Sequence, residues 1–172
     1  MSYKIFQIDT SIRPTSDSYS RRSGQYFIRK FQEKFGQLEV SYLDLNREAP
    51  SSHFLDSMCS SNIWLWCLSA EISAIPASLA TWMNFVSHKK FSLNQSCQVK
   101  LFSQKLVVIA NLQKETDTLS PKFNVEPQIR RDIKICGIDD VDFFYMFQKD
   151  NNMQGEIKLQ KDINKYIAGL HL

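Results

Sequence analysis

The sequence predicts an α/β fold: a doubly wound sheet of five parallel strands, in the order 2-1-3-4-5, with helices on both faces. Three observations predict it. Short apolar runs bounded by polar segments recur along the 172 residues, and stretches with apolar residues at helical spacing lie between these runs. The run at residues 62–69 (NIWLWCLS) is apolar almost throughout, as expected of a strand covered on both faces. The length suits a single domain over residues 1–172.

The chain opens with a strand at Tyr3–Asp9 and continues, after a polar loop, into a helix from about Ser20 to Phe35. Strand-forming residues fill the first segment, and Gly36 provides a natural end to the helix. One apolar face of the helix repeats at helical spacing and is made by Phe27, Ile28, Phe31 and Phe35. This unit is the start of an open α/β sheet, with room for an anion where the strand gives way to the helix.

The loop between them, residues 10–20 (TSIRPTSDSYS), carries seven hydroxyl groups and Arg13. Free backbone N–H groups at a helix N-terminus attract phosphate, and hydroxyls add donors. Asp17 partly opposes such binding. The alternative is ordinary helix capping by Ser18 or Ser20, with the remaining hydroxyls on a polar surface. Both interpretations stay open, and the loop has neither a dinucleotide-binding glycine fingerprint nor a P-loop.

The rest of the chain supplies the remaining elements. Residues 38–44 alternate as a second strand should, and residues 53–58 suit a single helical turn. The fourth and fifth strands are expected at residues 105–110 (KLVVIA) and 141–147 (VDFFYMF). Further helices follow from apolar residues at helical spacing, at residues 75–86, 126–136 and 155–170.

Three motifs recur in one known family. They are a strand followed by Thr-Ser and Ser-Tyr-Ser-Arg at residues 10–21, Ile-Pro-Ala-x-Leu-x-x-Trp at 75–82, and Gly-Ile-x-Asp-Val at 137–141. In these the chain resembles a diverged and shortened member of the FMN-dependent NAD(P)H azoreductase and quinone reductase family, which has a flavodoxin-like fold. The resemblance spans nearly the whole chain. It implies that the phosphate of FMN contacts Ser11, Ser18 and Ser20, with Tyr19 between the last two.

By the same resemblance, two loops would contact the flavin ring. After the third strand the family has Pro-Met-Tyr-Asn-Phe, where this chain has Ser69, Ala70, Glu71, Ile72 and Ser73. After the fourth strand the family has Ser-Arg-Gly-Gly, where this chain has Asn111, Leu112, Gln113 and Lys114. Neither set of family residues is kept, and none of the five glycines falls in either loop. A carboxylate at Glu71 would disfavour a reduced flavin unless it points away from the ring.

Two functions follow and stay open. The resemblance implies an FMN-binding NAD(P)H-dependent oxidoreductase, a homodimer that passes two electrons to a quinone or azo compound. Its partners would be NAD(P)H and a small aromatic acceptor, and the flavin would carry the chemistry. No catalytic residue is identified, because no convincing acid–base pair is present. The alternative is a diverged non-catalytic flavodoxin-like protein that binds another phosphate-bearing ligand or a protein partner.

Composition and charge indicate which partners, metal sites and cellular location to expect. The net charge of +3 comes from scattered Lys and Arg residues, which argues against nucleic acid or a membrane surface as partner. Neither the cysteines nor the histidines show metal-ligand spacing, so no metal site is expected. The start of the chain lacks an apolar signal region. The four cysteines are far apart without a CxxC pair, which favours free thiols and a cytoplasmic location.

Overall fold

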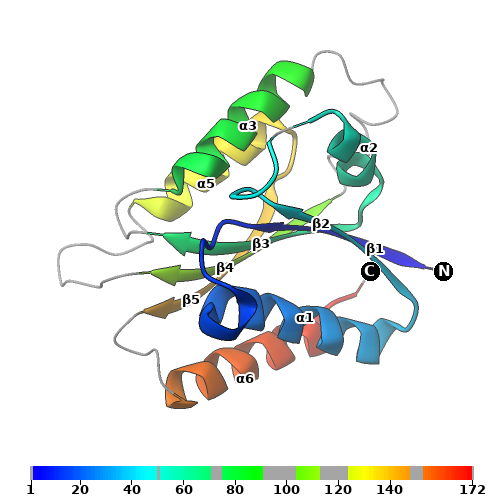
Figure 1. Cartoon of the computed structure of the whole chain (residues 1–172). Helices are drawn as coiled ribbons and strands as arrows, with labels where there is room; N and C mark the ends of the chain where they lie inside the picture. The colour runs from blue at the N-terminus through cyan, green and yellow to red at the C-terminus, as the bar shows by residue number, and fades with distance from the viewer. Residues whose placement is uncertain are drawn as a thin grey trace.

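The computed structural model describes residues 2–49, 51–70, 75–90, 104–112, 124–147 and 153–171. Its strands form one parallel sheet in the order β2-β1-β3-β4-β5 (Figure 1), which confirms the predicted order. The strands are β1 (Tyr3–Asp9), β2 (Leu38–Asp44), β3 (Ile63–Ala70), β4 (Lys105–Leu112) and β5 (Asp140–Phe147). Because all five run in one direction, their carboxyl ends share a single edge of the sheet.

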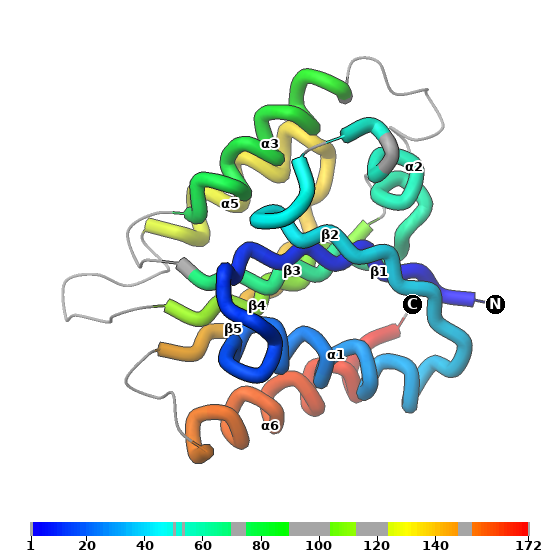
Figure 2. The backbone as a smooth tube through the Cα atoms, in the orientation of Figure 1, coloured from blue at the N-terminus to red at the C-terminus, as the bar shows by residue number. Residues whose placement is uncertain are grey.

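Helices cover both faces of this sheet. Helices α1 (Tyr19–Phe35) and α6 (Met153–Gly169) lie side by side on one face, and α3 (Ala77–Lys90) and α5 (Val125–Ile135) lie on the other (Figures 1 and 2). A short 3-10 helix, η1 (Thr15–Asp17), precedes α1. Helix α2 (His53–Ser60) spans eight residues, so the expected single turn is extended. Strand β4 also runs further than expected, which places Asn111 in a strand.

The apolar core divides between the two faces because side chains alternate along each strand. Phe6, Trp64 and Trp66 face α3 and α5, whereas Ile5 and Leu65 face α1 and α6. Every side chain of β3 from Ile63 to Leu68 is buried, as the apolar run predicted. The two layers fix the sheet and hold the start of α1 at its carboxyl edge.

One cysteine departs from the expected free thiols. Cys59 is disulfide-bonded, so the expectation of free thiols is wrong for this residue. Cys67 and Cys136 are free and buried, and Cys97 lies outside the described residues. Sequence spacing could not show this because disulfides join cysteines that the fold brings together, whatever their separation in the chain.

Gly24 sets how closely α1 approaches the sheet. A Cβ atom at this position would overlap Cys67 Sγ on β3 and would lie 3.3 Å from Gln7 Nε2 on β1. Cys67 is fully buried, so its sulfur has no free space to move into. A glycine on the buried face of α1 is therefore a packing requirement.

We expect Gly24→Ala to lower the free energy of unfolding, although alanine is the better helix former by about 1 kcal/mol. The reason is the overlap with Cys67, since overpacking a core costs about 1–3 kcal/mol. Chemical denaturation of Gly24→Ala, Cys67→Ala and the double variant tests this. With the sulfur removed, the nearest Cys67 atom to the new methyl is its Cβ at 3.7 Å, so the double variant should be more stable than Gly24→Ala. Strict additivity of the two effects would contradict the explanation.

Candidate functional site

The serine loop, residues 10–20, lies between β1 and α1 at the carboxyl edge of the sheet. Its three family-matched serines, Ser11, Ser18 and Ser20, are 2%, 3% and 1% exposed. Ser18 is the N-cap of α1, and its Oγ accepts from the backbone N–H of Arg21 at 3.4 Å. The hydroxyls of Ser18 and Ser20 lie 3.2 Å apart. Capping and a cluster of hydroxyls at a helix N-terminus therefore occur together.

The remaining members of the loop lie around this cluster. Ser11 Oγ accepts from the backbone N–H of Arg13 at 3.3 Å. Tyr19 is the first residue of α1, and the guanidinium carbon of Arg22 lies 4.2 Å from the centre of its ring. The backbone N–H of Ser69 donates to Thr10 Oγ1 at 3.1 Å, which ties the serine loop to the end of β3.

A buried arginine anchors the loop. The side chain of Arg21 is only 7% exposed, and its guanidinium donates to the backbone carbonyl of Ser11. It also donates to Tyr42 Oη at 2.8 Å and to Asp44 Oδ2 at 2.7 Å, both on β2. Removing a guanidinium from water is costly unless its donors find partners. These bonds therefore hold α1, the loop and β2 in one arrangement.

A second buried acid, Asp9, completes this cluster. It pairs in register with Asp44, and its Oδ2 accepts from Tyr42 Oη at 2.7 Å. Gln7 Nε2 lies 3.4 Å from both carboxylate oxygens, and Arg21 lies 3.9 Å away. Burial raises the pKa of Asp9, and the hydrogen bond from Tyr42 and the charge of Arg21 only partly oppose this.

The groups beside Asp9 stay protonated. Burial, followed by the hydrogen bond to Asp9, raises the pKa of Tyr42, so the phenol remains a donor. Complete burial raises the pKa of Cys67 well above its usual value, and a thiol in this state is a poor nucleophile. The cluster is therefore a set of neutral donors around one buried carboxyl and one buried ion pair.

The sequence did not single out Asp9, Arg21, Tyr42 or Asp44 as site residues. Two signals were available in it. Asp9 and Asp44 each end a predicted strand, and neighbouring parallel strands bring such ends together. Arg21 falls in the same helical row as Gly24 and Phe27, so a cation on the buried face of α1 could have been matched to two acids.

The flavin-ring side of the predicted site is described in part. Ser69 and Asn111 are in register, as are Ala70 and Leu112, so the ends of β3 and β4 lie together. The buried Oδ1 of Asn111 lacks a hydrogen-bond partner within the described ranges. Glu71, Ile72 and Ser73 lie outside the described residues, as do Gln113 and Lys114. An unpaired buried carbonyl costs about 1–3 kcal/mol, so a ligand N–H at this point would be stabilising.

Two hollows accompany these groups. The first, which we call the polar cavity, has a volume of about 430 Å³ and lies between α1 and the β1–β2 pair. It is lined by Gln7, Asp9, Pro14, Thr15, Arg21, Gln25, Tyr42 and Arg47. None of the three family-matched serines lines it. The polar cavity therefore shares Pro14 and Thr15 with the serine loop but lies apart from the three family-matched serines.

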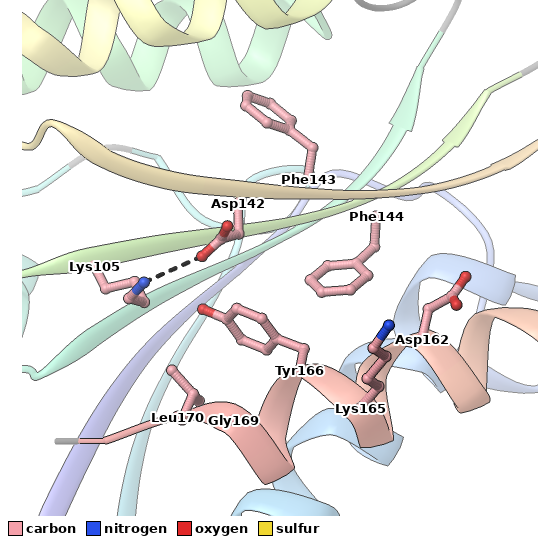
Figure 3. Close-up of a pocket in the computed structure, with 9 residues that line it drawn as sticks. All are labelled: Lys105, Asp142, Phe143, Phe144, Asp162, Lys165, Tyr166, Gly169 and Leu170. Atoms are coloured by element: carbon pink, nitrogen blue, oxygen red, sulfur yellow. Dashed lines mark hydrogen bonds and ion pairs between the residues drawn. The ribbon is translucent and has the colours of Figure 1, made fainter.

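The second hollow, of about 600 Å³, lies against β4, β5 and α6 (Figure 3). Lys105 there binds Asp140 at 2.7 Å and Asp142 at 3.2 Å. Phe144 and Tyr166 meet edge to face at 5.2 Å, and Figure 3 shows the Tyr166 hydroxyl directed toward Lys105 and Asp142. Lys105 begins β4, so this hollow lies away from the carboxyl edge where doubly wound sheets bind ligands.

The described part of the chain contains no group of three or more His, Cys, Asp or Glu side chains that could hold a metal ion. Among the helices of the described ranges, none is long and apolar enough to cross a membrane.

Comparisons with known proteins show the fold. No family model matches the sequence, and a search of curated proteins finds no match. An FMN-dependent NADH-azoreductase from Bacillus anthracis, solved with FMN, has a TM-score of 0.74 at 12% identity, covering 96% of this chain and 98% of that one. An NADPH-quinone reductase from P. pentosaceus has a TM-score of 0.64 at 13% identity, with 99% and 100% coverage.

A third comparison gives the fold its name. Oxidised flavodoxin 1 from Bacillus cereus superposes with a TM-score of 0.64 at 9% identity, covering 98% of this chain and 99% of that one. Together with the strand order 2-1-3-4-5, this confirms the flavodoxin-like fold. The resemblance to azoreductases and quinone reductases is confirmed at the level of the fold.

The raised pKa of Asp9 predicts a pH-dependent stability. A carboxyl that binds its proton more tightly when folded stabilises the protein below the unfolded value of about 3.9, and this contribution is lost as the pH rises through the folded value. We therefore expect wild type to lose stability relative to Asp9→Asn as the pH rises above about 4. Urea unfolding across this range measures the difference, with the exposed Asp56→Asn in α2 as control. A constant difference would show that burial leaves Asp9 unperturbed.

Proposed function

We propose that this flavodoxin-like chain binds FMN and acts as an NAD(P)H-dependent oxidoreductase that passes two electrons to a quinone or azo compound. The observation that carries the proposal is the cluster of three buried serines at the N-terminus of α1, held in place by Arg21. Beside it are structural neighbours whose names include FMN, NADH and NADPH. In the same proposal the chain is a single domain that works as a homodimer.

The phosphate of FMN fits the serine loop on electrostatic grounds. The N-terminal end of α1 carries a partial positive charge, and Arg21, which pairs with Asp44, holds the loop in place through the carbonyl of Ser11. Ser18 and Ser20 hydroxyls, which contact each other at 3.2 Å, can rotate to donate to phosphate oxygens. Ser11 belongs to the same loop and is also buried. These groups would hold the phosphate.

The ring of FMN would lie across the ends of β3 and β4, against Ala70, Glu71, Ile72, Ser73 and Asn111. Asn111 Oδ1, which is buried and unpaired in the described part of the chain, would accept from a ring N–H. When bound, the flavin supplies the redox chemistry, and the chain's residues bind and orient it. Cys67 is not required, because burial keeps its thiol protonated.

A second candidate is the binding of another phosphate-bearing ligand without redox chemistry. The observation that favours it is the composition of the two ring-contacting loops, since none of the five glycines of the chain falls in either one. Glycine permits close approach of a backbone to a ligand. A phosphate-bearing ligand with a smaller flat group would need less of that approach. The two candidates share the serine loop and differ at the ring.

Titration with FMN and with riboflavin, which lacks the phosphate, separates the contributions of loop and ring. We expect Ser20→Ala to weaken FMN binding about tenfold, a loss of roughly one charge-assisted hydrogen bond, and to leave riboflavin binding unchanged. Ser23→Ala is the matched control, because this buried hydroxyl three residues further along α1 has no partner in the described structure. Wild type that shows no saturable FMN binding would overturn the proposed function.

Asn111→Leu tests the ring side. We expect it to weaken FMN and riboflavin equally, by about tenfold, because both carry the same ring. The free energy of unfolding should not fall, since the buried Oδ1 forms no hydrogen bond within the described ranges. Fluorescence titration and chemical denaturation measure the two effects. If Asn111→Leu binds FMN as tightly as wild type does, the flavin ring does not contact Asn111. Oxidation of NAD(P)H by the flavin-loaded protein then tests for turnover.

A further inference from the structure

The polar cavity contains more charge than a packing defect would. Asp9, Gln7 and Arg21 line it and are 1%, 4% and 6% exposed. Arg47, by contrast, is a surface residue whose side chain is 76% exposed. The cavity thus has a buried polar floor and a cation at its mouth. Its volume of about 430 Å³ lies in the range of small-molecule sites.

Counting formal charges shows what the cavity lacks. Arg21 and Arg47 both contact Asp44 Oδ2, at 2.7 Å and 3.4 Å. Two guanidinium groups against one carboxylate leave one positive charge. Ionised Asp9 would balance it, and so would a bound anion. The two cannot both be present without an excess of negative charge in a poorly solvated space, which is costly.

The groups around Asp9 stabilise its negative charge only weakly. The charged or titratable groups that face it are Arg21 from α1, Tyr42 and Asp44 from β2, and Cys67 from β3. Tyr42 and Cys67 stay neutral, and Asp44 is an acid. The Arg21 guanidinium lies 3.9 Å from the Asp9 carboxylate but 2.7 Å from the Asp44 carboxylate. Its positive charge therefore stabilises mainly the negative charge of Asp44. Burial then makes protonation of Asp9 easier than for an exposed acid.

We propose that the polar cavity binds a small oxyanion, a carboxylate or an inorganic anion, together with one proton on Asp9. The anion binds at Arg47, whose guanidinium can donate hydrogen bonds to two oxygens at once. Thr15 and Gln25, which also line the cavity, supply a hydroxyl and an amide donor. The proton on Asp9 removes the competing negative charge. This site includes none of the three family-matched serines and does not depend on flavin binding.

Nitrate is the probe, because it carries a single negative charge throughout the range from pH 5 to pH 8, and any pH dependence then belongs to the protein. Isothermal titration should show affinity at least about tenfold higher at pH 5 than at pH 8. Titration in two buffers with different ionisation enthalpies should show proton uptake on binding. Formate, which is also ionised throughout, tests the carboxylate form of the ligand and should show the same dependence.

Three variants test the assignment. Arg47→Ala should lose binding by about tenfold or more, whereas Arg131→Ala should not, since Arg131 is a similarly exposed arginine paired with Asp132. Asp9→Asn should bind nitrate as well at pH 8 as at pH 5, because its cavity always carries the extra positive charge. Ser20→Ala should bind the anion as wild type does, because Ser20 does not line the polar cavity.

Several results would overturn the proposal. Loss of nitrate binding in Ser20→Ala but not in Arg47→Ala would assign the anion to the family-matched serines. Binding that takes up no proton, or that is equally strong in wild type at pH 5 and pH 8, would remove the role of Asp9. No saturable binding of either anion would remove the site. Arg47 lies on the surface, so its variant stays informative if Asp9→Asn fails to fold.

Discussion

The buried guanidinium of Arg21 is the interaction on which the carboxyl edge of the sheet depends. It lies between Asp44 and the serine loop and bonds to both, with Tyr42 as a third partner. Without it, Asp9 and Asp44 would be two neighbouring acids with no buried cation between them, and breaking a buried pair in this way typically costs about 3–5 kcal/mol. The position of the loop is therefore fixed by charge as well as by the helix that follows it.

The same cation serves two neighbouring spaces. On one side it holds the carbonyl of Ser11, and so the loop in which the serines converge. On the other it lines the polar cavity, where Asp9 and Arg47 complete the charge balance. A change of charge in the cavity alters the field at Arg21, and the hydrogen bonds of Arg21 set the loop. The polar cavity and the serine loop can therefore influence each other through the charge of Arg21 without any movement of the sheet.

How much of this could be predicted depends on which interactions are local. The strands and the course of α1 followed from apolar spacing, which each segment carries in its own residues, and the strand order followed from the alternation of strands and helices. The roles of Ser18 and Gly36 at the ends of α1 were also visible, since caps are local. The partnership of Arg21 with Asp9 and Asp44 was not predicted, because it requires the register of β1 against β2. Gly24 likewise needs the distance between α1 and Cys67.

Asn111 gives the physical argument that separates the two candidate functions. Its carbonyl is buried without a partner in the described part of the chain, and such an oxygen is destabilising by about 1–3 kcal/mol. A leucine there would fill similar space at no such cost. A ligand that offers an N–H donor at the end of β4 while its phosphate lies at α1 would offset this cost. A flavin ring meets this condition, and a phosphate-bearing ligand without such a donor does not, so the chemistry of Asn111 favours the flavin.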